Sequence, residues 1–177
     1  MSFAIWLTGP SGVGKTVLAH SLEKKLKEMG KKVEVLDGDF VRRTLYPSIG
    51  FNKDSREMHN RIVIHIAKLL ARNGVIPIIS LISPYRRVRE FARQKLGQFI
   101  EVYLKCPLNV RIQRDPKGLY KKAMRGEIKG LTGYDGVYEE PNSPEVVVET
   151  DAMSVEEEVE LVINKAMELD YLQDKEA

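Results

Sequence analysis

Residues 9–16 read GPSGVGKT, and the types and spacing of these residues are those of a loop that holds nucleotide phosphates. Glycine at positions 9 and 14 lets the backbone turn so that successive N–H groups face an anion. Lys15 is placed to reach the β- and γ-phosphate oxygens, and the Thr16 hydroxyl is placed to bind Mg²⁺. The pattern therefore predicts binding of a purine nucleoside triphosphate through Gly9, Ser11, Gly12, Gly14, Lys15 and Thr16.

A pair of carboxylates is the second feature that could do chemistry. The apolar segment at 33–36 is followed directly by Asp37, Gly38 and Asp39. Parallel α/β sheets bind ligands at the carboxyl ends of their strands, so we expect both aspartates beside the phosphates. One of them would help to hold Mg²⁺ and accept the proton of an acceptor hydroxyl. The alternative is a simple turn. The sequence lacks the Asn-Lys-x-Asp motif of GTPases, which favours a kinase.

The elements that must position these residues alternate along the chain. Apolar and β-branched runs predict strands, and apolar residues at helical spacing predict helices. We expect strands at 3–8, 32–36, 76–82, 99–104 and 146–149, and helices at 15–29, 55–73, 86–96, 107–114 and 155–169. Ser154 is the expected N-cap of the last helix. This alternation predicts an α/β fold, with a five-stranded parallel sheet flanked by helices in the three-layer arrangement of P-loop nucleotide kinases.

The segment at about 115–144 breaks this alternation. It is rich in glycine and charged residues, carries no strong apolar period and is long for a connection. Such a segment is typical of a lid that closes over phosphates. The 177 residues are therefore interpreted as one domain, residues 1–177, that includes this lid.

The composition restricts the kinds of molecule that the chain could bind. The net charge of +3 is too small to indicate nucleic-acid binding, but arginines concentrate in the middle of the chain. Solvated helix faces would account for some of them, and a cavity for an acidic small molecule would account for the others. The arginines concerned are Arg42, Arg43, Arg56, Arg61, Arg86, Arg87, Arg89 and Arg93.

Cys106 is the single cysteine, so the chain forms no internal disulfide. No apolar stretch reaches membrane length, and we expect a cytoplasmic protein without membrane contact.

Longer motifs make the sequence resemble the adenylylsulfate kinase family along almost its whole length. The matching segments are GPSGVGKT, LDGDFVR at 36–42, IGF at 49–51, LISPYRRVR at 81–89, RDPKGLYKKAMRGEIKGLTG at 114–133 and YEEP at 138–141. The resemblance implies an enzyme that transfers the ATP γ-phosphoryl group to the ribose 3′-hydroxyl of adenosine 5′-phosphosulfate, with Mg²⁺. It also implies a homodimer.

The resemblance implies roles for the residues at matching positions. Asp39 would associate with Mg²⁺ and orient or deprotonate the 3′-hydroxyl, Lys117 would close over the bridge between the two nucleotides, and Arg114 would flank the ATP base. The catalytic set is thus Lys15, Asp39 and Lys117, with Thr16 and Asp39 at the metal. The acceptor side would comprise Asp39, Arg42, Phe51, Arg56, His59, Arg61, Ile82, Ser83, Lys117 and Leu131. Ser83 matches a position that is phosphorylated in some members, and a purely structural serine is the interpretation we favour.

The chain departs from the family pattern around the acceptor. After IGF, members read close to S-x-x-DR-x-x-N-x-RR, whereas Ser55 replaces the Asp here, His59 falls on the Asn position and Ile62 replaces the second Arg. Leu131 stands where members have the Phe that stacks on the acceptor adenine, with Tyr134 a possible substitute. The pair Arg111 and Ile112 replaces Cys-Glu ahead of the RD motif.

These departures leave two alternatives to adenylylsulfate phosphorylation. A kinase on the same scaffold could act on another nucleotide or an anionic sugar, which the altered acceptor residues would support. A nucleotide-binding regulatory protein with weakened turnover is the other alternative, and the intact Lys15, Asp39 and Lys117 argue against it.

Overall fold

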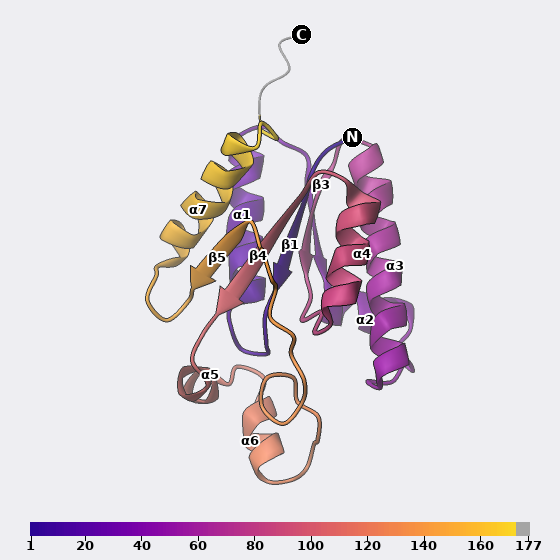
Figure 1. Ribbon diagram of the computed structural model, residues 1–177, viewed down its shortest axis with the longest axis vertical. Helices are drawn as coiled ribbons and strands as arrows, with labels where there is room; N and C mark the ends of the chain where they lie inside the picture. The colour runs from indigo at the N-terminus through magenta and orange to yellow at the C-terminus, as the bar shows by residue number, and fades with distance from the viewer. Residues whose placement is uncertain (173–177) are drawn as a thin grey trace.

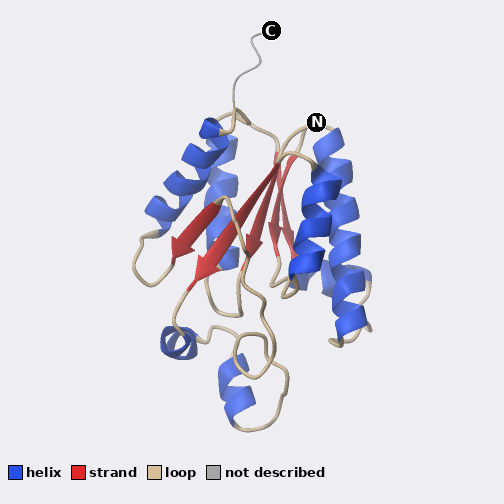
Figure 2. Cartoon of the chain, viewed as in Figure 1, coloured by secondary structure: helices blue, strands red, loops and turns tan. Residues whose placement is uncertain are grey.

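A computed structural model describes residues 1–172, and its centre is a five-stranded sheet in which every neighbouring pair is parallel. The strand order is β2-β3-β1-β4-β5, and the strands fan across the molecule in Figure 2. The predicted fold class is therefore confirmed. The strands are β1 (Ala4–Thr8), β2 (Val33–Asp37), β3 (Ile76–Ser80), β4 (Phe99–Lys105) and β5 (Val146–Glu149).

Helices cover both faces of this sheet, as Figure 1 shows. One core cluster joins α1 and α7 to one face, and a second joins α3 and α4 to the other. All residues of β1 are buried because the strand lies between these two layers. The helices are α1 (Lys15–Glu28), α2 (Gly38–Leu45), α3 (Lys53–Arg72), α4 (Arg86–Leu96), α5 (Leu108–Arg114), α6 (Leu119–Met124) and α7 (Val155–Glu168).

Two short helices lie where the sequence predicted none. Helix α2 forms because the Asp37 carboxylate accepts hydrogen bonds from the backbone N–H groups of Asp39 and Phe40, each at 3.0 Å. Helix α6 follows Gly118, whose left-handed φ of 66° redirects the chain inside the predicted lid. Both helices are too short for apolar periodicity to reveal them.

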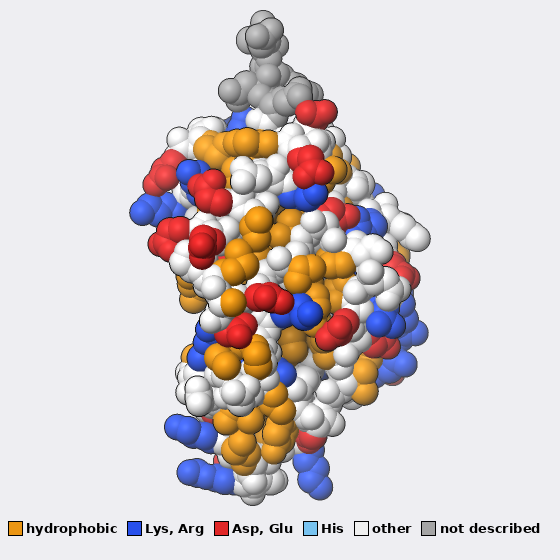
Figure 3. Space-filling model, turned by 60° about the vertical axis from the view of Figure 1, so that its left-hand side comes forward, with side chains coloured by type: hydrophobic (Ala, Val, Ile, Leu, Met, Phe, Trp, Pro, Cys, Tyr) orange, Lys and Arg blue, Asp and Glu red, His pale blue; other side chains and the backbone are white. Residues whose placement is uncertain are grey.

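The functional end of the molecule lies beyond the carboxyl ends of the strands. In Figure 1, α5, α6 and the loop between β1 and α1 gather at this end, whereas the N-terminus lies at the opposite end. No helix within residues 1–172 is long and apolar enough to span a membrane. On the face seen in Figure 3, patches of hydrophobic side chains alternate with acidic and basic groups.

A strap of residues 138–145 returns the chain from the lid to β5. Arg93 of α4 holds its far end, donating to both carboxylate oxygens of Glu145 at 2.6 and 2.8 Å. Arg89 holds its near end by donating to the Glu139 carbonyl at 2.5 Å. The strap is therefore fixed to α4, and through α4 to the sheet.

Candidate active site

The loop after β1 has the backbone that the GPSGVGKT pattern predicts. Gly14 precedes α1 with a φ of 100°, a conformation that side chains rarely adopt. Gly9 is required for a different reason, because a Cβ atom there would lie 2.7 Å from the Leu104 carbonyl oxygen. The loop thus opens onto the N-terminus of a 14-residue helix, where backbone N–H groups and the helix dipole favour an anion.

Lys15 folds back onto this loop. Its ammonium group donates to the carbonyl oxygens of Gly9 and Pro10, both at 2.8 Å. Burial and the neighbouring positive charge of Lys117 lower the pKa of Lys15 from 10.5 to about 7. A polyphosphate bound in this loop would add negative charge that favours the protonated ammonium group.

Thr16 and Asp37 meet at the entrance to the loop. The Thr16 hydroxyl donates to Asp37 Oδ2 at 3.2 Å, while Asp37 Oδ1 caps α2. Within residues 1–172 no group of three or more His, Cys, Asp or Glu side chains could enclose a metal. A hydroxyl beside one carboxylate nevertheless suits Mg²⁺, which proteins commonly hold through one or two carboxylates together with substrate phosphates.

Asp39 and Lys117 form an ion pair across the site. Asp39 lies on α2 and Lys117 at the start of the lid, so the pair joins segments 78 residues apart. Burial alone would raise the pKa of Asp39, but the Lys117 hydrogen bond and the charges of Lys117 and Lys15 outweigh burial and lower it. Asp39 is therefore ionised at neutral pH and faces the loop that carries Lys15.

Several residues assigned to the acceptor side gather around Phe51, whose side chain is exposed. The Arg42 guanidinium lies 4.6 Å from the ring centre and donates to the Gly50 carbonyl at 2.7 Å. Arg56 donates to the Phe51 carbonyl at 2.6 Å and to the lid residue Thr132 at 2.7 Å. Two guanidinium groups and one aromatic ring thus lie together beside Thr132 of the lid, an arrangement that suits an acidic aromatic molecule.

Arg61 lies apart from this group. Its guanidinium packs over the Phe91 ring of α4, 4.9 Å from the ring centre. Leu131 is buried in the lid, where its backbone N–H donates to Asp135 at 2.7 Å. The Tyr134 ring packs edge-on against Tyr120 with 6.1 Å between ring centres, so its aromatic partner is another lid residue.

Ser83 closes the floor of the site between β1 and β3. Its φ of 40° is left-handed, and its side chain is buried. The hydroxyl accepts from Trp6 Nε1 at 3.0 Å and donates to Thr8 Oγ1 at 3.1 Å, and Thr8 in turn donates to the Ile82 carbonyl at 2.8 Å. These contacts support the structural interpretation of Ser83.

Arg111 is a site residue that the sequence did not reveal as an anchor. It is buried and donates to the Cys106 carbonyl at 3.1 Å, the Gly133 carbonyl at 3.2 Å and the Tyr120 hydroxyl at 2.9 Å. Tyr120 donates onward to the Ser11 carbonyl at 2.7 Å. Arg111 therefore links the lid to the phosphate-binding loop, and only its departure from the family pattern drew attention to it.

Arg114, the last residue of α5, forms hydrogen bonds to the turn after β5. It donates to Thr150 twice, to the hydroxyl at 3.1 Å and to the carbonyl at 2.7 Å. This contact ties the end of α5 to the turn after β5.

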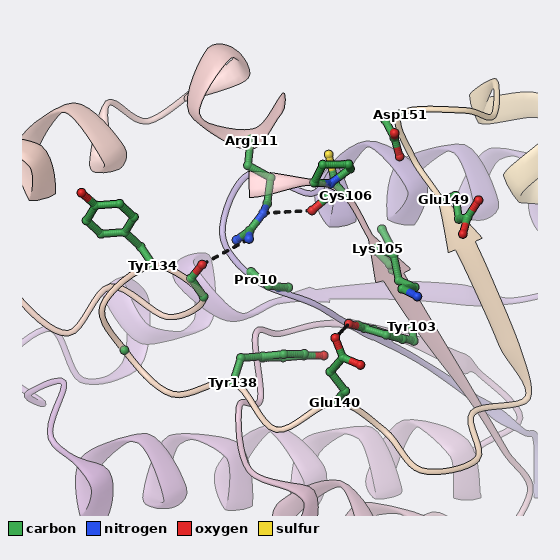
Figure 4. Close-up of a pocket in the computed structure, with 14 residues that line it drawn as sticks. Pro10, Tyr103, Lys105, Cys106, Arg111, Tyr134, Tyr138, Glu140, Glu149 and Asp151 are labelled. Carbon is green, nitrogen blue, oxygen red and sulfur yellow. Dashed lines mark hydrogen bonds between the residues drawn. The ribbon is translucent and has the colours of Figure 1, made fainter. Parts of the chain in front are cut away.

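A cavity of about 570 Å³ lies on the β4–β5 side of the phosphate-binding loop (Figure 4). The figure shows the Arg111 side chain of α5 pointing in at one end, with the Tyr134 ring turned outward, and Tyr103 and Glu140 joined by a hydrogen bond at the other end. Its lining includes Pro10 of the loop but none of Lys15, Asp39 and Lys117. The reacting groups therefore lie outside this cavity.

Comparison with known proteins agrees with this geometry. The family model for adenylylsulphate kinase matches residues 1–149. A probable adenylyl-sulfate kinase of Pyrococcus abyssi is 69% identical over 96% of this chain and 98% of its own length. An adenylyl-sulfate kinase of Rippkaea orientalis is 51% identical over 95% of this chain and 93% of its own length.

Solved structures give the same result. An APS kinase of Mycobacterium tuberculosis, in complex with AMPPNP and APS, superimposes with a TM-score of 0.90 at 37% identity, covering 94% of this chain and 98% of that one. A hexameric APS kinase from Thiobacillus denitrificans matches with a TM-score of 0.73 at 28% identity, covering 98% of this chain and 30% of that one.

Proposed function

The chain belongs to the adenylylsulphate kinase family, and we propose that it transfers the γ-phosphoryl group of ATP to the ribose 3′-hydroxyl of adenosine 5′-phosphosulfate. The products are 3′-phosphoadenylylsulfate and ADP. The observation that carries the proposal is the meeting of three groups at one end of the sheet. These are the phosphate-binding loop with Lys15, the Asp39–Lys117 pair, and the arginines around Phe51.

The chemical step needs little more than positioning and charge neutralisation. The 3′-oxygen attacks the γ-phosphorus, the bond from that phosphorus to the β–γ bridging oxygen breaks, and ADP leaves with the bond's electrons. Asp39, ionised and facing the loop, orients the hydroxyl and accepts its proton. Lys15 and Lys117 neutralise charge on the transferred group. Both lysines lie close enough to Asp39 to influence its pKa.

Mg²⁺ would be held by Thr16 and a carboxylate, with the nucleotide phosphates completing its coordination. The metal supplies neutralisation of the negative charge on the phosphates. Asp39 is the carboxylate we assign from the sequence, and Asp37 is the one that contacts the Thr16 hydroxyl. Either carboxylate would hold the metal together with the Thr16 hydroxyl.

The acceptor would bind between Phe51 and the lid. Phe51 offers a ring for its adenine, and Arg42 and Arg56 offer guanidinium groups for its phosphate and sulfate oxygens. Backbone near Ile82 and Ser83 lines the floor, and Leu131 contributes apolar contact from the lid. Arg61 would have to leave the Phe91 ring to reach the acceptor.

A homodimer is part of the proposal, and the hexameric relative shows that assembly varies among similar chains. Light scattering coupled to size-exclusion chromatography would measure the mass of the particle directly. A mass of about twice the 20.1 kDa chain supports the dimer, and any other mass contradicts it.

The test of function is isothermal titration of adenylylsulfate into the protein in the presence of Mg²⁺ and ADP, with adenosine monophosphate as the matched control ligand. Because only adenylylsulfate carries the sulfate, we expect it to bind at micromolar or lower Kd and the monophosphate far more weakly. Equal affinities would mean that the pocket recognises another acceptor. A coupled assay of ADP release with and without adenylylsulfate then measures transfer itself.

A further inference from the structure

The side chain of Tyr120, the second residue of α6, reaches from the lid to the phosphate-binding loop. It is fully buried, and its hydroxyl donates to the Ser11 carbonyl at 2.7 Å. Its backbone is held as well, because the Asp115 carboxylate accepts from the N–H groups of Tyr120 and Lys121 at 3.1 and 3.0 Å. The lid therefore presents to the loop a hydroxyl whose side chain and backbone are both fixed.

Arg111 decides which way this hydroxyl points. Its guanidinium donates to the Tyr120 oxygen at 2.9 Å, and it also donates to the Cys106 and Gly133 carbonyls, the two bonds drawn in Figure 4. A guanidinium can only donate, and a tyrosine hydroxyl has a single proton. Burial raises the pKa of Tyr120, so the hydroxyl keeps that proton at neutral pH. Because Arg111 is the donor in the first bond, the Tyr120 proton is directed to the Ser11 carbonyl.

The Ser11 carbonyl belongs to a peptide group that is part of the phosphate-binding loop. The peptide bond to Gly12 is trans, so the carbonyl oxygen and the Gly12 N–H point in opposite directions. With the oxygen on Tyr120, the N–H is turned away from this lid contact. Gly12 has a φ of 78°, and a glycine leaves the orientation of its peptide weakly determined by the backbone alone. A hydrogen bond from outside the loop is what selects one orientation.

We propose that Arg111 and Tyr120 are positioning residues that hold the Ser11–Gly12 peptide in the orientation that presents the Gly12 N–H to the phosphates of a bound nucleotide. Arg111 acts through Tyr120, and Tyr120 acts through the peptide, so neither side chain touches the nucleotide. This inference rests on the nucleotide binding in the proposed function and is independent of the identity of the acceptor.

Arg111 stands where the family pattern has cysteine. A cysteine side chain offers one weak donor, whereas a guanidinium offers five donors in a fixed fork. The fork is what supplies donors to the Tyr120 oxygen and to two carbonyls at once. In this chain the direction of the Tyr120 proton therefore depends on the arginine.

The first measurement is calorimetric titration of ADP with Mg²⁺ into the wild-type protein, Tyr120→Phe and Arg111→Met. Because a buried carbonyl loses its donor, we expect the Kd of Tyr120→Phe to rise about threefold to tenfold. Arg111→Met should show a smaller rise, since the hydroxyl remains but is no longer directed. The matched controls are Tyr171→Phe, whose ring packs on Phe3 at the opposite end of β1 from the loop, and Arg125→Met, which is exposed after α6. Both should bind as the wild type.

The carbonyl ¹³C signal of Ser11 reports the proposed hydrogen bond directly. The dipeptide Ser-Gly occurs once in the chain, at 11–12, so labelling serine carbonyls with ¹³C and glycine nitrogens with ¹⁵N gives a single correlation. Loss of the hydrogen bond should move this signal to lower frequency in Tyr120→Phe, and by less in Arg111→Met. Phenylalanine keeps the ring, so a purely packing role of Tyr120 would leave the signal in place.

The two measurements must agree. An unchanged Ser11 signal in Tyr120→Phe would overturn the proposal, and so would a shifted signal with wild-type affinity for ADP. The double variant Arg111→Met/Tyr120→Phe should bind ADP as Tyr120→Phe does, because both changes act through one hydroxyl. Additive losses would show that Arg111 acts by another route.

The proposed function can fail separately. If the wild-type protein binds ADP but transfers nothing to adenylylsulfate, the acceptor assignment is wrong, and the Ser11 signal and the ADP affinities still decide the role of Arg111 and Tyr120. If one of the two single variants does not fold, the other decides it by the same two measurements.

Discussion

Asp39 has two partners during the proposed reaction, the acceptor hydroxyl and Lys117, and both depend on its negative charge. The ion pair with Lys117 is largely exposed, so its own contribution to stability is small. Its importance lies in placing a lid residue directly over the carboxylate. We therefore expect changes at Asp39 to alter the rate of transfer and to leave the stability of the fold nearly unchanged.

Replacement of Asp39 by alanine should abolish most of the transfer. General-base catalysis contributes about 10²–10⁴-fold, and we expect a loss of kcat in that range, with ATP affinity changed little. The measurements are ADP release with adenylylsulfate and titration of ATP. Asp54→Ala, on the exposed first turn of α3, is the control and should behave as the wild type. Equal turnover in Asp39→Ala would remove Asp39 from the mechanism.

Lys15 predicts a pH dependence of nucleotide binding. Because burial lowers its pKa to about 7, the side chain is mostly neutral above that pH and charged below it. A bound polyphosphate favours the charged form, so binding should take up close to one proton per site at pH 8.5 and almost none from Lys15 at pH 6. Affinity should consequently fall as pH rises through 7.

Titration of ATP in buffers with different ionisation enthalpies measures this proton uptake. Lys15→Met should bind nucleotide weakly, with no uptake at pH 8.5. Uptake that is the same in both proteins would assign the proton to another group.

At the scale of elements, helix α7 is secured by its own first turn. The Ser154 hydroxyl accepts from the Glu157 backbone N–H at 3.2 Å, and the Glu157 carboxylate accepts from the Ser154 N–H at 2.7 Å. This reciprocal arrangement confirms Ser154 as the N-cap that the sequence predicted. Since α7 packs on α1, whose N-terminus forms the phosphate site, the cap also supports the active site indirectly.

Replacement of Ser154 by alanine should lower the free energy of unfolding by about 1 kcal/mol, because the Glu157 N–H loses its partner. Urea unfolding followed by circular dichroism measures the change. Ser154→Asp keeps an acceptor at the N-cap and should lie within a few tenths of the wild type. If alanine and aspartate were equally destabilising, the hydroxyl would have no capping role.

The sequence predicted those helices and strands whose pattern of apolar residues lies within the element itself. The strands and the longer helices appear within a few residues of their predicted ends, because buried runs and helical spacing are local signals. The hydrogen bonds that hold the site residues in place join residues far apart in the sequence. Arg111 reaches Gly133 and Arg56 reaches Thr132, partners 22 and 76 residues away. Nothing in the spacing of the chain indicates such pairs, so the sequence points to candidate reacting residues without the contacts that position them.

For the molecule as a whole, α4 connects the sheet, the floor of the site and the strap. Arg89 is almost fully buried and donates to Glu101 of β4 at 2.9 Å, to the Ser83 carbonyl at 2.5 Å and to the Glu139 carbonyl. A single guanidinium group therefore joins three segments. Removing it would leave the buried Glu101 carboxylate with Arg93 as its remaining cationic partner, at 3.4 Å.

Arg89→Met should consequently destabilise the protein by about 3–5 kcal/mol, the usual effect of breaking a buried ion pair. Thermal or urea unfolding measures the loss. Arg86→Met is the matched control, since Arg86 lies on the same helix and also donates to the strap, at the Glu140 carbonyl, but is exposed. We expect that variant to lose about 1 kcal/mol or less. Similar losses in both variants would show that burial of Arg89 is unimportant.

The folded-back position of Lys15 bears on how the protein distinguishes nucleotides. To bind a polyphosphate in the loop, the Lys15 ammonium group must leave the Gly9 and Pro10 carbonyls. This displacement is the same for ATP and ADP, so it lowers both affinities and cancels in their ratio. Discrimination between substrate and product must therefore arise from contacts with the third phosphate, and Lys117, which reaches Asp39 from the lid, is one group that we propose makes such a contact.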